Sequence, residues 1–290
     1  MRKPNGSVRA CSSGSQNVGD ASLTLPALFI GLMLAVSTAG AAEWTGSDAV
    51  TRAFKEAGVT GTFVLYDVAA DRYTVHNRVR ADVRYVPAST FKVANTLIGL
   101  TVGSVASVDQ VLPYGGKPQM IKAWEHDMSL RDAIKVSNVP VYQELARRTG
   151  IKRMREQLSK LDYGNGDIGT VVDTFWLVGP LQISAVEQVR FQARLAQDKL
   201  PFPKPAMAST REIMLLEKTR DYSLYGKTGW SNSTEPGIGW WTGWVQKGGN
   251  VYAFALNMDI VDDDDGQKRV PLGRASLAAL GLISQPVATK

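Results

Sequence analysis

The chain has 290 residues, of which 44% are hydrophobic and 21% are charged, values that are ordinary for a folded globular protein. Its formal net charge is +6, but its lysines and arginines form no dense run, so the sequence predicts no nucleic-acid partner. The only cysteine, Cys11, excludes a disulfide within the chain and any cysteine-based metal site.

An apolar run at residues 25–36 lies near the N-terminus, behind a few basic residues. The run is short for a membrane span, and small residues that end at Ala41 follow it. We therefore predict a signal peptide over residues 1–41, export to the periplasm, and no stable membrane contact after cleavage. An uncleaved membrane anchor is the alternative.

Helical and strand patterns alternate just after the predicted leader. Residues 47–58 place apolar side chains at helical spacing. The runs 61–68 and 72–77 are rich in aromatic and β-branched residues and are joined by a short polar turn. The pattern predicts one helix followed by two strands.

The middle of the chain, from 90 to about 219, has a mainly helical pattern. Three serines, each followed by an acid three residues later, predict helix starts at Ser129, Ser184 and Ser209. Gly150 is placed to end a helix.

The last part of the chain returns to strand. The runs 222–230, 238–246 and 250–260 are rich in aromatic and β-branched residues, and a Gly-Gly pair at 248–249 is typical of a hairpin turn. A closing helix is predicted over about 272–283.

Strands at both ends of the chain, with helices between them, predict an α+β fold. We expect an antiparallel β-sheet flanked by terminal helices, with an inserted, mainly helical subdomain. The predicted catalytic domain spans 42–290 as a single unit. Its sheet subdomain covers about 42–88 and 220–290, and its helical subdomain covers about 89–219.

The stretch VPASTFKVANTLIGL, residues 86–100, has the pattern of a buried helix that begins near Ala88. Ser89 lies in its first turn, and Lys92 follows three residues later on the same face. Burial lowers the pKa of a lysine, so such a lysine can act as a base toward a serine nucleophile. On its own, however, this pattern favours a lysine that reaches the surface.

A second motif, YGKTGW at residues 225–230, changes that balance. Its glycines let a ligand approach the strand backbone, while Lys227 supplies a cation and Thr228 a hydroxyl. These groups suit a carboxylate. A Ser-x-x-Lys at a helix start followed by Lys-Thr-Gly on a strand is typical of serine β-lactamases and penicillin-binding proteins.

Over nearly all of residues 43–285 the sequence resembles a class D (OXA-type) serine β-lactamase, of the penicillin-recognising serine acyltransferase superfamily. The matching motifs, in order, are Ser89-Thr-Phe-Lys92, Ser137-Asn138-Val139, Tyr163-Gly164-Asn165, Phe175-Trp176-Leu177, Lys227-Thr228-Gly229, Gly239 to Trp244, and Arg274. Val139 departs from the Ser-Asp-Asn of class A enzymes and from the Ser-x-Asn of typical penicillin-binding proteins.

The resemblance implies that the protein opens the β-lactam ring of penicillin-type antibiotics through an acyl-enzyme and so gives resistance to them. Ser89 is expected to be the acylated nucleophile. Lys92, carboxylated by CO₂ or bicarbonate to N6-carboxylysine, is expected to be the general base. Trp176 is expected to hold the carbamate, and Ser137 to relay a proton to the leaving nitrogen.

The same resemblance implies a set of substrate-binding residues: Val139, Leu177, Lys227, Thr228, Gly229, Trp230 and Arg274. Three of them, Lys227, Thr228 and Arg274, are expected to bind the substrate carboxylate. The backbone N–H groups of Ser89 and Trp230 are expected to form the oxyanion hole. The two aliphatic residues are expected to shield the modified lysine from water.

No metal or cofactor is expected apart from CO₂ or bicarbonate. His76 and His126 are far apart in the sequence and make a poor zinc site without cysteine. The acidic run 262–265 is interpreted as a solvated turn rather than a calcium loop. The expected partners are small-molecule β-lactams, and the oligomeric state stays open.

Three other functions use similar motifs. A β-lactam receptor domain would be acylated and stay so, but such a domain usually follows transmembrane helices. A peptidoglycan transpeptidase or carboxypeptidase is disfavoured by Val139 and by the short chain. A wall-binding protein without catalytic activity is the remaining alternative.

Overall fold

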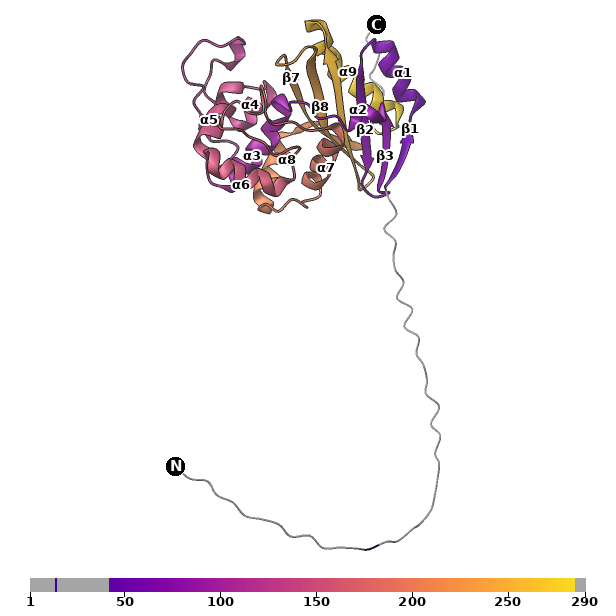
Figure 1. Ribbon diagram of the computed structural model, residues 1–290, viewed down its shortest axis with the longest axis horizontal. Helices are drawn as coiled ribbons and strands as arrows, with labels where there is room; N and C mark the ends of the chain where they lie inside the picture. Colours follow the sequence, from indigo (N-terminus) through magenta and orange to yellow (C-terminus); the bar gives the residue numbers. More distant parts are fainter. Residues whose placement is uncertain (1–13, 15–41, 285–290) are drawn as a thin grey trace. The chain divides into compact units, whose positions relative to one another are not determined.

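The computed structural model describes residue 14 and residues 42–284 (Figure 1). The predicted signal peptide, including its apolar run and the cleavage site near Ala41, lies outside the described residues apart from Gly14. Within the described ranges, the helices are all too short or too polar to cross a membrane.

A seven-stranded sheet has the strand order β1-β3-β2-β9-β8-β7-β6 (Figure 1). Its strands are β1 (Glu43–Gly46), β2 (Gly61–Asp67), β3 (Arg72–His76), β6 (Leu215–Lys218), β7 (Tyr222–Ser231), β8 (Gly237–Lys247) and β9 (Asn250–Ile260). Neighbouring strands are antiparallel except β1 and β3, which are parallel. Because β2 pairs with β9, the first and last parts of the chain meet inside the sheet. A separate pair consists of β4 (Val111–Leu112) and β5 (Met128–Ser129).

Helices precede, interrupt and follow these strands. They are α1 (Asp48–Ala57), α2 (Arg78–Ala81), α3 (Lys92–Thr101), α4 (Leu130–Lys135), α5 (Val139–Thr149), α6 (Ile151–Leu161), α7 (Ala185–Ala196), α8 (Lys204–Ile213) and α9 (Asp263–Ala279). Two short 3₁₀ helices are η1 (Ala88–Phe91) and η2 (Lys122–Trp124).

Different helices cover the two faces of the sheet (Figure 1). Helices α1 and α9 pack together on one face, and α7 packs across β9 and β2 on the other. The side chains of β2 alternate between two buried clusters: Val64 belongs to the cluster on the α7 side, whereas Phe63 and Leu65 belong to the cluster on the α9 side. The central residues 63–65 of β2 are therefore apolar at consecutive positions, as expected for a strand buried on both faces.

The predicted α+β fold with a sheet and terminal helices is confirmed. The five predicted strands, 61–68, 72–77, 222–230, 238–246 and 250–260, are confirmed to within one residue at each end. Ser129 and Ser184 cap α4 and α7 as predicted. The sequence did not predict the short strands β1, β4, β5 and β6, which hold too few residues to show an alternating pattern.

Two predicted helix boundaries are wrong. Ser209 lies inside α8, which begins at Lys204 directly after Pro203. Helix α9 begins well before residue 272, and the acidic run 262–265, of which residues 262–264 are exposed to solvent, forms its capped first turn. Negative side chains are favourable there because the N-terminal end of the helix dipole is positive.

The division into a sheet subdomain and a helical subdomain stays a prediction. Helix α7 belongs to the mainly helical part of the chain, yet it packs against the sheet strands β2, β8 and β9. Helices α3, α5 and α6 instead pack against one another. The candidate site is built where η1 and α3 meet strand β7.

Candidate active site

Ser89 and Lys92 are buried together where η1 meets α3. Lys92 Nζ lies 2.6 Å from Ser89 Oγ. Lys92 is 0% exposed and Ser89 is 9% exposed. The helical segment begins at Ala88 as predicted, but its first turn, which carries Ser89, is the 3₁₀ helix η1, and α3 begins at Lys92. The N–H of Thr90 donates to the Pro87 carbonyl, which tightens this turn.

Buried donors hold the turn η1 from two sides. Ala88, which precedes the serine, has a φ of +50°, in the left-handed region that residues with a Cβ rarely adopt. Trp240 Nε1 donates to the Val86 carbonyl over 2.9 Å, and Gln188 Nε2 donates to Thr90 Oγ1 over 2.9 Å. Such strained backbone persists where the surrounding structure determines it, as at many functional sites.

The site contains two buried lysines, Lys92 and Lys227, whose charges influence each other. Burial lowers the pKa of Lys92 well below its usual value, and the nearby charge of Lys227 lowers it further. Burial also lowers the pKa of Lys227 to about 7, with a second contribution from the positive charge of Arg269. The site therefore favours a neutral Lys92, whose lone pair can accept the hydroxyl proton of Ser89.

The Lys-Thr-Gly triplet of β7 passes directly beside η1. A Cβ atom on Gly229 would lie 2.9 Å from the Pro87 carbonyl oxygen, so a glycine is needed for the strand to come this close. Lys227 Nζ lies 3.0 Å from Ser137 Oγ and 3.3 Å from Thr228 Oγ1. A cation and two hydroxyls are therefore placed next to the buried Ser–Lys pair.

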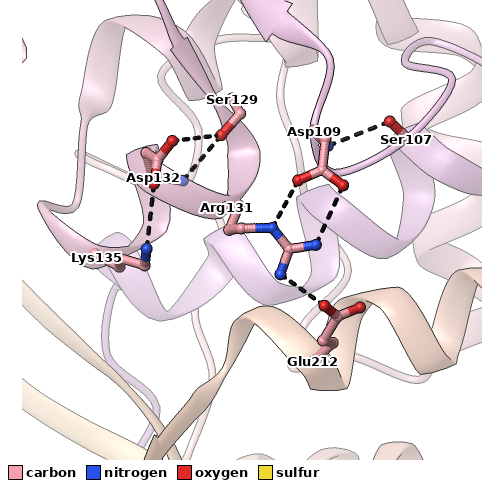
Figure 2. A network of polar contacts seen from close by, with 7 residues as sticks. All are labelled: Ser107, Asp109, Ser129, Arg131, Asp132, Lys135 and Glu212. Atoms are coloured by element: carbon pink, nitrogen blue, oxygen red, sulfur yellow. Dashed lines mark hydrogen bonds and ion pairs between the residues drawn. The ribbon is translucent and has the colours of Figure 1, made fainter.

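Ser137 lies in the turn between α4 and α5. Helix α4 is itself held by hydrogen bonds of Arg131 to residues outside the site. Arg131 on α4 donates to Asp109 in the preceding loop over 2.6 Å and to Glu212 on α8 over 2.7 Å (Figure 2). Figure 2 shows the guanidinium between the two carboxylates, so one side chain joins three segments. The N-terminal end of α4, the helix that precedes the Ser137 turn, is thus held against the loop at Asp109 and against α8.

Trp176 contributes a buried N–H group that has no acceptor. Its side chain is 0% exposed and stacks on Phe91, the residue before Lys92, with ring centroids 5.4 Å apart. No residue in the described part of the chain accepts a hydrogen bond from Trp176 Nε1. Buried polar groups are nearly always paired, and an indole N–H can only donate. The group therefore suits an acceptor that the unmodified chain does not supply.

The two aliphatic residues predicted to shield the lysine are half-buried. Val139 opens α5 two residues after Ser137. Leu177 follows Trp176, packs against the main apolar cluster, and accepts a 2.8 Å hydrogen bond from Ser231 Oγ through its carbonyl. That bond connects the tryptophan loop to the end of β7.

The Tyr-Gly-Asn motif anchors the segment that follows Trp176. Asn165 Nδ2 donates to the Pro180 carbonyl over 2.9 Å, and its Oδ1 accepts from the Gln182 N–H over 3.0 Å. A Cβ atom on Gly164 would lie 1.9 Å from the Gln182 carbonyl oxygen, and this residue has a φ of +59°. The motif is explained by this close approach rather than by contact with a substrate.

The two arginines of α9 have different surroundings. Arg274, predicted to bind the carboxylate, lines a cavity of about 470 Å³ together with Lys227 and Thr228, but its guanidinium is paired with Glu217 over 2.8 Å. Arg269 instead donates to the Gly229 carbonyl over 2.5 Å, and its guanidinium carbon lies 5.1 Å from the centre of the Trp230 ring. Arg269 is therefore the arginine that contacts the Lys-Thr-Gly triplet.

The structure brings together most of the residues singled out from the sequence. One hydrogen bond joins Ser89 and Lys92, two others join Lys227 to Ser137 and Thr228, and Gly229 lies close to Pro87 and Thr90 of the turn that carries Ser89. Arg269 and Gln188 were not predicted, and Trp240 was named only as part of the motif from Gly239 to Trp244, without a role in holding η1. Gln188 and Trp240 act from elements distant in sequence, and Arg269 carries no motif of its own. Among the residues the structure describes, no three His, Cys, Asp or Glu side chains are grouped to hold a metal ion.

The sequence is similar to a known protein family and to proteins of known function. The chain matches the family model of the penicillin binding protein transpeptidase domain over residues 60–278. It is 40% identical over 260 residues to beta-lactamase OXA-5 of Pseudomonas aeruginosa, an alignment that covers 89% of this chain and 97% of that protein. It is also 40% identical over 242 residues to beta-lactamase OXA-48 of Klebsiella pneumoniae, with 83% and 91% covered.

A solved structure agrees with these relatives. The crystal structure of FUS-1 (OXA-85), a class D beta-lactamase from Fusobacterium nucleatum subsp. polymorphum, matches with a TM-score of 0.80 and 43% sequence identity. The match covers 83% of this chain and 100% of that chain. The chain belongs to the class D β-lactamases, within the family of the penicillin-binding-protein transpeptidase domain.

Proposed function

We propose that this enzyme hydrolyses the β-lactam ring of penicillin-type antibiotics through an acyl-enzyme on Ser89, and so gives resistance to them. One observation carries the proposal: Ser89 Oγ lies 2.6 Å from the fully buried Nζ of Lys92. A serine needs an adjacent base to become a nucleophile, and a lysine serves as one when burial lowers its pKa.

We propose that Lys92 is carboxylated on Nζ by CO₂. Carboxylation needs a neutral amine, which burial favours, and it adds oxygens that need donors. The unpartnered Nε1–H of Trp176 supports this fit. When bound to Lys92, CO₂ supplies a carboxylate-type base for both acylation and deacylation. Leu177 and Val139 then keep bulk water from this group, and Trp176 holds it by donating a hydrogen bond.

Ser89, Ser137 and Trp230 each have a proposed role in acylation, and hydrolysis of the ester follows. Ser89 Oγ gives its proton to the base at Lys92 and bonds to the lactam carbonyl carbon, the ring C–N bond breaks, and the nitrogen takes a proton relayed through Ser137. Backbone N–H groups of Ser89 and Trp230 stabilise the oxyanion. Water then gives a proton to the base at Lys92 and attacks the ester carbonyl, the bond from that carbon to Ser89 Oγ breaks, and Ser89 Oγ takes a proton back.

Binding of the substrate carboxylate is assigned to Lys227, Thr228 and Arg269. The resemblance implied Arg274, which lines the cavity but is paired with Glu217, whereas Arg269 contacts the triplet itself. Arg269 lies against Gly229 and lowers the pKa of Lys227 through their mutual repulsion, which an anion between them would relieve. A carboxylate is the kind of ligand that two such cations favour.

Multiple turnover on a chromogenic β-lactam tests the proposal. Purified protein is depleted of bicarbonate and then supplied with it, with Ser89→Ala as the inactive control. We expect many turnovers per enzyme and a rate that rises with bicarbonate. A single stoichiometric burst that bicarbonate does not extend would instead indicate a β-lactam receptor or a transpeptidase with an acylated Ser89.

We also propose that the chain is exported to the periplasm after cleavage near Ala41. The support is the apolar run at 25–36 and the small residues that follow it. N-terminal sequencing of the protein from a periplasmic extract tests this proposal. Recovery of the full leader in the membrane fraction would support an uncleaved anchor.

A further inference from the structure

The backbone at Ser137 is held in a conformation that a serine rarely adopts. Its φ is +56°, in the left-handed region where glycine, asparagine and aspartate are common. Residues in this region keep it only when neighbouring contacts determine it. The side chain nevertheless has to meet Lys227 Nζ at 3.0 Å.

Local backbone bonds shape the turn but do not connect it to another part of the chain. The N–H of Ser137 donates to the Ile134 carbonyl over 3.3 Å, and the N–H of Asn138 donates to the Ala133 carbonyl over 2.8 Å. Both acceptors belong to α4. These bonds let the turn move together with α4.

Trp124, the last residue of η2, bonds to the turn on both sides of Ser137. Its Nε1 donates to the Val136 carbonyl over 2.9 Å. Its own carbonyl accepts a hydrogen bond from Asn138 Nδ2 over 3.2 Å. The residues before and after the serine are thus both tied to one residue of a different segment.

The two residues that Trp124 contacts, Asn138 and Val136, differ in how they are packed. Asn138 is 0% exposed, and its Oδ1 also accepts from the Val141 N–H over 3.0 Å, which caps α5. Val136, in contrast, is 41% exposed, so little packing holds its side chain. The Val136 carbonyl is therefore fixed by the indole N–H rather than by apolar contacts.

We propose that Trp124 is a positioning residue that sets the orientation of Ser137 for the proton relay. The proposal rests on the proposed function, because it assigns Trp124 to the acylation step in which Ser137 passes a proton to the leaving nitrogen. A small misplacement of a relay group slows the step that uses it by one to two orders of magnitude.

Trp124→Phe tests the proposal in the full-length enzyme, because it removes the N–H donor and keeps an aromatic ring. Pre-steady-state kinetics with a chromogenic penicillin separate the acylation rate from the deacylation rate. We expect acylation to fall by roughly tenfold and deacylation to change by less than about twofold. Trp44→Phe, on the edge strand β1, is the matched control and should leave both rates unchanged.

A double-mutant cycle with Ser137→Ala shows whether Trp124 acts through Ser137. We expect Trp124→Phe to add no further loss once the hydroxyl of Ser137 is gone. Equal losses in both backgrounds would overturn the proposal and assign Trp124 a separate effect, such as contact with the substrate.

Three further results would also overturn the inference. An unchanged acylation rate in Trp124→Phe would show that the indole N–H is not needed. Failure of both Trp124→Phe and Trp124→Tyr to fold would make the residue structural. A normal acylation rate in Ser137→Ala would remove the relay role itself, and with it the basis for Trp124. Continued turnover in that last case would leave the Ser89 acyl-enzyme proposal intact.

Discussion

Arg274 Nη2 donates to Glu217 Oε2 over 2.8 Å, and this ion pair joins α9 to the edge strand β6. Both side chains are about one-third exposed, so the pair contributes on the order of 0.5 kcal/mol to stability. Arg274 is thus engaged with β6, whereas Arg269 contacts the Lys-Thr-Gly triplet.

The two arginines of α9 should therefore differ when each is replaced. We expect Arg269→Ala to raise KM for a penicillin by roughly 10- to 100-fold, because a hydrogen bond to a charged group contributes about 1.5–3 kcal/mol. Arg274→Ala should change KM by less than about twofold. Steady-state kinetics of both variants, with Tm measured alongside, check this. A larger effect at Arg274 would restore it as the carboxylate-binding arginine.

Trp176→Phe should make activity depend on added bicarbonate. The substitution keeps the ring that stacks on Phe91 and removes the N–H proposed to hold the carbamate. We expect at least about a tenfold loss of kcat that excess bicarbonate partly restores.

Trp244 provides the matched control for that variant. It is also 0% exposed with an unpartnered Nε1 among the described residues, but it stacks on Tyr225 within the sheet. Trp244→Phe should leave the bicarbonate dependence unchanged. Carboxylation itself is measured by ¹³C NMR of protein in labelled bicarbonate, and a full carbamate signal in Trp176→Phe would rule out the proposed role.

Lys227→Met should stabilise the folded protein near neutral pH while it abolishes carboxylate binding. Burial lowers the pKa of Lys227 from about 10.5 to about 7 on folding. Between these values the unfolded chain binds more protons than the folded chain, so the wild type loses stability as pH falls through that window. Methionine carries no such charge. We expect the variant to be more stable by roughly 2–4 kcal/mol near pH 7.

The pH dependence distinguishes this effect from simple repacking. Urea denaturation near pH 7 and near pH 10 should show an advantage that shrinks toward zero as pH rises toward the usual pKa of lysine. An advantage of the same size at both pH values would assign it to packing of the methionine side chain.

Gly243→Ala should disturb the strand that carries the Lys-Thr-Gly triplet. Gly243 pairs with Gly226 across β7 and β8, and a Cβ atom at Gly243 would lie 2.0 Å from the Tyr225 carbonyl oxygen. We expect a loss of about 3 kcal/mol in the free energy of unfolding and a lower kcat, because backbone must shift. Gly46→Ala, with nothing within 4 Å, is the control. Equal stabilities of the two variants would show that the strand adjusts freely.

The sequence predicted those parts of the fold that local patterns determine. Five strands hold at least five residues each and are rich in aromatic and β-branched side chains: β2, β3, β7, β8 and β9. The caps at Ser129 and Ser184 act within one helical turn. The same holds for Ser89 and Lys92, whose three-residue spacing places both side chains together on any helical turn.

The rest depends on contacts between distant segments. Arg269 reaches Gly229 only because α9 packs back on the sheet, and the sequence motifs pointed to Arg274 instead. Trp124 likewise looks like an ordinary loop tryptophan until its bonds to Val136 and Asn138 are known. The 3₁₀ geometry at Ala88 depends on Gln188 and Trp240, which follow it by about a hundred residues or more.

The pairing of β2 with β9 makes synthesis of the whole chain a condition for any activity. Partners in this pair are separated by roughly 190 residues, so the ribosome must complete almost the entire protein before the sheet can close. A chain terminated before residue 250 keeps Ser89, Lys92 and Lys227 but leaves both β2 and β8 with an unpaired edge. We expect proteases to degrade such a fragment, so that a frameshift just before β9 abolishes activity as completely as one near the start of the gene.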